Sequence, residues 1–284
     1  MTDKYNTKYQ EMIIDHIDNS YTNNVIARRN LVASRNFLIG ANKVYQVYFN
    51  YGFISDVIDE CDYNINCKLT ENQFELLYTK YRALGSSEKL ILERYPNNTC
   101  GYCRTSRATE IDHYLPQSVF RSYSIVFNNL VPSCHECNHK KGDAVPNSGD
   151  VFFFNPNFEK IDEGFYLDVE ISEKYESIVF LIRNTKNNKF IQSLNFTFIN
   201  LGVYNEYSRQ ANTVLIGSLQ LYHKLKQRKG TRKALQVFRD KQDENKTGYN
   251  ELWRRSLYRF LLSNIDFQEQ GYVEYLKMHN RPLQ

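Results

Sequence analysis

The sequence contains little glycine, proline or methionine, with 12, 6 and 3 residues among 284. It has no low-complexity tract, internal repeat or long linker. No apolar run approaches the roughly 18 residues that a bilayer-spanning helix needs, so we expect no membrane span. Residues 1–6 lack the apolar core of a signal peptide, and we therefore expect a cytoplasmic protein.

The net charge of the chain is also small. The chain has 36 Lys and Arg against 32 Asp and Glu, a net charge of +4. Phosphate contacts come from clustered cations, so this total permits nucleic-acid binding without indicating it. Hydrophobic residues at 42% and charged residues at 24% are ordinary for a soluble globular protein, and the length allows a substantial core.

The six cysteines carry the strongest pattern in the chain. Four of them form two C-x2-C pairs, Cys100/Cys103 and Cys134/Cys137, and the reducing cytoplasm disfavours disulfides. Two such pairs supply the four thiolates of a closed, tetrahedral structural zinc site. Cys61 and Cys67 have the wrong spacing for a zinc hook, and we expect ordinary reduced thiols there.

Helical patterns fill the N-terminal part of the chain. Apolar residues recur at helical spacing over residues 9–17 and 31–51, the second stretch with an interruption near Gly40. Thr70 is a plausible N-cap with Gln73 as its capping-box partner, and Ser86 or Ser87 would cap the next helix.

Strand patterns and then helical patterns follow the cysteine-rich segment. Residues 151–156, 164–171, 177–182 and 190–198 predict a small antiparallel sheet. Residues 204–225, 232–238 and 251–262 predict helices.

The segment between and after the cysteine pairs offers acid, imidazole and amide side chains. Asp112 provides a hard oxygen ligand for a divalent metal, and in an extended backbone His113 points the opposite way. A histidine of near-neutral pKa is suited to act as general base toward a water molecule. Asn129 could orient that imidazole by accepting its second ring proton. A salt-bridged surface pair is the alternative reading of Asp112 and His113.

Residues after the last cysteine predict the rest of a second site. Asn138, at the start of a short helix, could bring a second oxygen ligand to the metal, with His139 as the alternative. Lys141 and Lys140 suit a nucleic-acid phosphate, or they form a solvated helix face.

The central segment resembles the HNH nuclease family in its zinc-stabilised ββα-metal form. The resemblance covers residues 100–142 and rests on the ordered pattern Cys100-x2-Cys103, Asp112-His113-x2-Pro116, Asn129-Leu-Val-Pro-x-Cys134-x2-Cys137-Asn138-x2-Lys141-Gly142. It implies a β-hairpin that carries Asp112 and His113, and a helix that carries the last metal ligand. It also implies hydrolysis of DNA phosphodiesters with Mg²⁺ or Mn²⁺, or alternatively Ni²⁺ or Zn²⁺.

The same residues and the Asn155-Pro156-x-Phe158 segment are similar to bacterial HNH proteins encoded beside a large ATPase, including the Septu and retron-linked anti-phage systems. That similarity implies the nuclease effector of a defence or restriction system that acts with an ATPase partner. A non-catalytic, zinc-stabilised nucleic-acid-binding module is the alternative function.

These expectations define an α+β protein with mostly helical flanks and a small antiparallel sheet around a central zinc-bound ββα-metal module. The predicted division is a helical region over residues 1–98, the HNH module over 99–146 and a mixed strand and helix region over 147–284.

Overall fold

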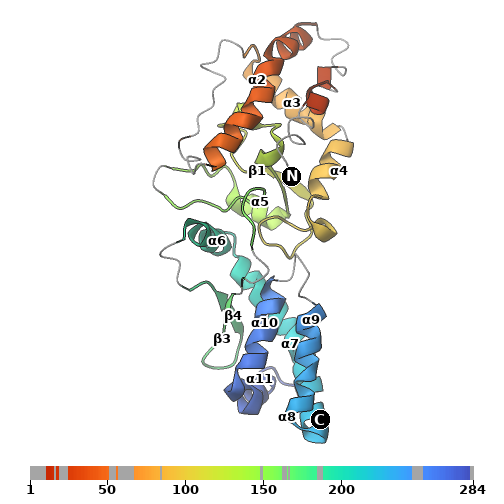
Figure 1. Cartoon of the computed structure of the whole chain (residues 1–284), viewed down its shortest axis with the longest axis vertical. Helices are drawn as coiled ribbons and strands as arrows, with labels where there is room; N and C mark the ends of the chain where they lie inside the picture. Colours follow the sequence, from red (N-terminus) through yellow and green to blue (C-terminus); the bar gives the residue numbers. More distant parts are fainter. Residues whose placement is uncertain are drawn as a thin grey trace. The chain divides into compact units, whose positions relative to one another are not determined.

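The computed structural model describes residues 11–15, 17–18, 25–50, 56, 67–83, 85–147, 150–161, 165, 167–183, 188–244 and 252–281. The chain divides into two compact units, Met1–Lys160 and Ile161–Gln284 (Figure 1). Each unit combines helices with a two-stranded antiparallel sheet in its described part, which confirms the predicted α+β class. The finer three-part division stays a prediction. No helix among the described residues is long and apolar enough to span a bilayer.

The first unit begins with helices that largely follow the predicted pattern. Residues 11–15 and 17–18 are helical, followed by α2 (Val25–Asn50), α3 (Glu71–Ala83), α4 (Ser86–Leu92) and a 3-10 turn at Pro96–Asn98. The expected interruption of α2 near Gly40 is wrong, because the helix runs unbroken through it. A glycine inside a helix costs only about 1 kcal/mol. The buried stripe that includes Leu31, Leu38 and Tyr45 outweighs that cost.

The two predicted helix starts have different outcomes. At α3 the backbone N–H of Thr70 donates to Gln73 Oε1 at 3.0 Å, as a capping box requires. At α4 the expected serine cap is wrong, since the N-cap residue is Gly85 and no side chain caps the helix.

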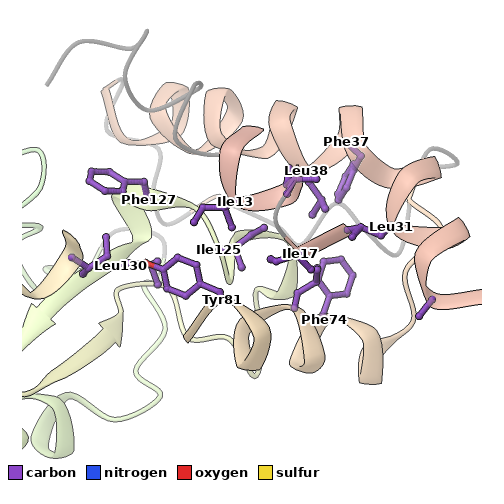
Figure 2. Close-up of a cluster of buried hydrophobic side chains, with 14 residues drawn as sticks. Ile13, Ile17, Leu31, Phe37, Leu38, Phe74, Tyr81, Ile125, Phe127 and Leu130 are labelled. Carbon is purple, nitrogen blue, oxygen red and sulfur yellow. The ribbon is translucent and has the colours of Figure 1, made fainter. Parts of the chain in front are cut away.

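One hydrophobic cluster joins these helices to the segment that follows the first cysteine pair. Ile17 and Leu38 pack with Phe74 of α3, and Ile125 and Leu130 contribute to the same cluster (Figure 2). Leu130 is fully buried and opens a strand of the central segment. The N-terminal helices therefore support the central segment directly.

The central segment forms a β-hairpin followed by a helix. Strand β1 (Glu110–His113) pairs antiparallel with β2 (Leu130–Ser133), with Asp112 opposite Val131, and α5 (His135–Lys141) begins two residues after β2. This is the ββα order that the resemblance implied. Short 3-10 turns at Arg121–Tyr123 and Phe127–Asn129 lie between the strands.

The second unit pairs β3 (Asp168–Ile171) with β4 (Ile178–Leu181) in antiparallel register. Its helices begin at residue 189 and continue almost to the end of the described chain. They are α6 (Lys189–Asn200), α7 (Val203–Lys229), α8 (Thr231–Ala234), α9 (Gln236–Glu244), α10 (Leu252–Ser263), a π-helical turn (Phe267–Gly271) and α11 (Tyr272–Met278).

Two predicted strands and one predicted thiol are wrong. Residues 151–156 form no strand, and residues 190–198 lie in α6. Alternating and helical spacings coincide in that apolar stretch, and the Asn188 side chain decides between them by accepting the N–H of Ile191 at 3.2 Å. Cys67 is disulfide-bonded and not a reduced thiol. Cys61 lies outside the described residues.

Candidate active site

The four paired cysteines converge on one point. The sulfur atoms of Cys100, Cys103, Cys134 and Cys137 all lie within 4.8 Å of one another, and all four residues are buried. None of the four is in a disulfide.

Backbone hydrogen bonds shape the two hooks before any metal is considered. The N–H of Cys100 donates to the Ser106 carbonyl at 2.8 Å, and the Arg104 N–H returns to the Cys100 carbonyl at 2.9 Å. Gly101 donates to the Pro132 carbonyl on β2, which fixes the first hook against the hairpin. A side chain at Gly101 would collide with Tyr95, so the first hook requires glycine there.

The thiol cluster fits a zinc ion. In tetrathiolate zinc sites each sulfur lies about 2.3 Å from the metal, so the four sulfurs must gather closely, as they do here. Burial raises the pKa of the Cys100 thiol, so without a cation its thiolate would be hard to form. A bound Zn²⁺ removes that penalty by stabilising the thiolates. The zinc would hold β1, β2 and α5 in one arrangement.

Asp112 faces the interior of the ββα element. Its carboxylate accepts the Tyr102 hydroxyl at 2.5 Å and pairs with Lys141 Nζ at 3.0 Å. The Lys141 side chain is fully buried, and its ammonium also donates to the His113 carbonyl at 2.8 Å. The expected exposure of Lys141 to a phosphate is therefore absent in this conformation.

Burial raises the pKa of Asp112, and the ammonium of Lys141 opposes the shift. The carboxylate can be buried because a cation lies against it. Lys141 thus shows that the Asp112 position accommodates positive charge, and carboxylate and amide oxygens suit a hard divalent metal. A divalent metal at Asp112 would compete with Lys141 for this carboxylate.

His113 lies on the opposite face of β1 and is half-buried. Its ring meets Tyr78 of α3 edge-on, with the centroids 4.4 Å apart. The ring atom Nε2 lies 2.8 Å from the Ser124 carbonyl oxygen. A carbonyl only accepts, so Nε2 carries the proton and Nδ1 keeps a free lone pair. Burial lowers the pKa of His113 to about 4, so the ring is neutral at pH 7 and can accept a proton.

The predicted contact between Asn129 and His113 is replaced by the one from Ser124. Asn129 is fully buried, and its side chain instead bonds both backbone groups of Leu115 and the carbonyl of Tyr123. These bonds hold the chain two residues after His113 and directly before Ser124. Asn129 therefore positions the group that orients the imidazole, and does not touch the imidazole itself.

The side chains of Asn138 and His139 point in different directions from α5. The Asn138 side chain donates to Glu110 Oε2 at 2.7 Å, which places it against β1. The His139 side chain is exposed and stacks on His135, whose Nδ1 contacts the other oxygen of Glu110 at 2.8 Å. Asn138 is therefore the one of the two that faces the strand carrying Asp112. Lys140 is exposed and pairs loosely with Glu136 on the same helix.

Sequence reasoning missed three contributors to the site. Glu110 is two residues before Asp112, so the period of a strand places both on the same face. That spacing could have identified it. Tyr102 and Ser124 gave no such signal. The Tyr102 hydroxyl reaches Asp112 from the first cysteine hook, and Ser124 contributes only its backbone carbonyl.

Comparison with known proteins identifies a family resemblance in this segment of the chain. Residues 95–147 match the family model described as HNH endonuclease. The segment is an HNH endonuclease domain. Over 59 residues the chain is 39% identical to the Septu protein PtuB of Bacillus thuringiensis. That match covers 19% of this chain and only 23% of the relative's length. No solved structure matches the chain significantly.

We predict one tightly bound zinc ion per chain, held by the four cysteines of the HNH domain. Cys137→Ser should abolish zinc retention and melt the ββα element, because a structural zinc supplies folding free energy directly. Metal analysis and circular dichroism measure both effects. A zinc-free chain that stays fully folded, with four freely reactive thiols, would contradict the site.

A second prediction concerns the buried pair of Asp112 and Lys141. Lys141→Met should destabilise the chain by about 3–5 kcal/mol, because it leaves a buried carboxylate without its cation. Asp112→Asn in the same chain should recover much of that loss. Urea denaturation measures the free energy of unfolding. Lys140→Met is the matched control, and its exposed pair should contribute about 0–1 kcal/mol. Equal effects at Lys140 and Lys141 would disprove the pairing.

Proposed function

We propose that this chain is a metal-dependent endonuclease that hydrolyses DNA phosphodiester bonds with His113 as general base. The HNH endonuclease domain supports nuclease activity in general. The observation that supports the finer assignment is the bond from His113 Nε2 to the Ser124 carbonyl, because it leaves Nδ1 of a neutral ring unprotonated and able to accept a proton.

In this mechanism the residues divide the work. His113 Nδ1 takes a proton from water as the new P–O bond forms, and the bond to the leaving sugar oxygen breaks. Asp112 and Asn138 would hold the metal, with Asn138 favoured over His139 because it faces β1. The metal, Mg²⁺ or Mn²⁺, would polarise the phosphate and stabilise the leaving oxygen.

Lys141 has two successive partners in this proposal. Before substrate binds, its ammonium neutralises Asp112. With a metal ion held at Asp112, this neutralisation would no longer be needed, and the ammonium of Lys141 would be available to a phosphate, whose accumulating negative charge a cation stabilises. The predicted phosphate contact of Lys141 would thus exist only in the metal-loaded enzyme.

We predict that His113→Ala lowers plasmid cleavage by about 100-fold to 10,000-fold, the usual contribution of a general base. Purified chain with Mg²⁺ or Mn²⁺ and supercoiled plasmid provides the assay, and zinc content confirms folding. His279→Ala, a histidine of the second unit, is the matched control and should cleave normally. A His113→Ala variant as fast as the wild type would exclude the assigned base. A wild type that binds DNA without cutting it would favour the zinc-stabilised binding module.

We further propose that the chain is the nuclease effector of a cytoplasmic anti-phage system and acts with an ATPase partner. The 59-residue similarity to the Septu protein PtuB supports this role. Cells that carry the chain together with the gene of its ATPase partner should lower phage plating clearly below that of cells with neither gene. Protection should vanish with His113→Ala or without the ATPase gene. Undiminished protection with His113→Ala would contradict a nuclease effector.

A further inference from the structure

Positive charge is concentrated in one short stretch of the second unit. Residues 224–241 contain 8 of the 36 Lys and Arg but only 1 of the 32 Asp and Glu. The remaining chain has 28 basic and 31 acidic residues and is therefore net negative by 3. The positive excess of the whole protein thus comes from this stretch, which forms the last turns of α7, then α8 and α9.

Packing turns these cations outward. Tyr222 of α7 stacks on Phe238 of α9 with the ring centroids 5.0 Å apart, and Ala234 of α8 is buried with them. Gly230, with φ of 79°, lets the chain reverse between α7 and α8, and α9 returns alongside α7 (Figure 1). The exposed basic side chains lie on the outside of this packed corner. We call them the basic surface: Lys224, Arg228, Lys229, Arg232, Lys233 and Arg239.

The basic surface is not neutralised by the protein. Within the described part of the chain, none of its six members forms an ion pair, whereas neighbouring Lys226 pairs with Glu269 at 3.3 Å. Asp240, the acid within the stretch, accepts from Gln236. The negative end of the α7 dipole accounts for cations at Arg228 and Lys229. It does not account for Arg232, which follows on α8.

The surface has the composition of a polyanion site and not of a protein interface. No large hydrophobic side chain is exposed within residues 224–241 of the described chain. Protein interfaces bury an apolar and aromatic centre, whereas nucleic-acid backbones are bound by clustered Lys and Arg. The HNH domain presents fewer such cations, because Lys141 is buried against Asp112, and Arg121 and Lys140 pair with Glu71 and Glu136.

We propose that the basic surface binds the phosphate backbone of nucleic acid and supplies the affinity that the HNH domain lacks. The inference rests on the proposed nuclease function for its role, but the binding itself is independent of catalysis. Backbone contacts carry no sequence information, so the surface would bind without sequence preference.

The test compares two fourfold variants of the full-length, zinc-loaded chain with equal change in net charge. The basic-surface variant carries Arg228→Gln, Lys229→Gln, Arg232→Gln and Lys233→Gln. The matched control carries Lys89→Gln, Lys160→Gln, Lys174→Gln and Lys277→Gln, four exposed lysines elsewhere. Both carry His113→Ala, so no substrate is cut during binding. Fluorescence polarisation measures affinity for labelled 30-base-pair DNA and RNA duplexes between 50 and 200 mM salt.

The basic-surface variant should bind at least about tenfold more weakly than the control. Its plot of log affinity against log salt should be shallower by roughly 3 to 4, since each lost phosphate contact reduces the slope by about 0.9. Equal affinity and slope in the two variants would overturn the inference. Competition by polyglutamate as effective as by DNA would also overturn it, in favour of an acidic protein. Failure of the nuclease proposal would appear separately, in plasmid cleavage by the chain with His113 intact.

Discussion

The convergence of four thiols is the constraint on which the central module depends. Cys100 and Cys103 precede the hairpin, Cys134 follows β2 and Cys137 lies in α5, so one zinc ion bound by all four would tie the segment before β1 to the junction of β2 and α5. The strands have only four residues each and could not maintain this arrangement by pairing alone. The N-terminal helices add a hydrophobic cluster through Leu130, and the clamp and the cluster together fix β1.

Strand β1 directs Asp112 and His113, to which the proposed mechanism gives different tasks, to opposite faces. The alternation of a strand directs Asp112 toward α5 and Lys141, and directs His113 toward Tyr78 and the Ser124 carbonyl. The buried ammonium lets the carboxylate remain inside the protein without a metal. The carbonyl fixes the imidazole tautomer, so a neutral nitrogen is available for a proton. Neither residue needs an unusual backbone conformation, because successive side chains of a strand point to opposite faces.

Much of this arrangement could be predicted from the sequence where the signal was local. The C-x2-C spacing identified the thiol cluster, and adjacency in a strand placed Asp112 and His113 on opposite faces. The partner of His113 could not be predicted, since the backbone carbonyl of Ser124 has no sequence signature and Asn129 acts one step away. Residues 190–198 were misassigned because an apolar run fits both periods until a capping side chain decides. The basic surface could not be predicted from the total charge, because acidic residues elsewhere in the chain offset most of its positive charge.

The proposed chemistry depends on a neutral His113 ring with an unprotonated Nδ1. Long-range nitrogen–proton NMR spectra of the zinc-loaded chain at pH 7 test it most directly, with His113→Ala assigning the resonances. The contact with the Ser124 carbonyl predicts a protonated Nε2 and an unprotonated Nδ1, because a carbonyl can only accept. A proton on Nδ1, or a doubly protonated ring at pH 7, would contradict it.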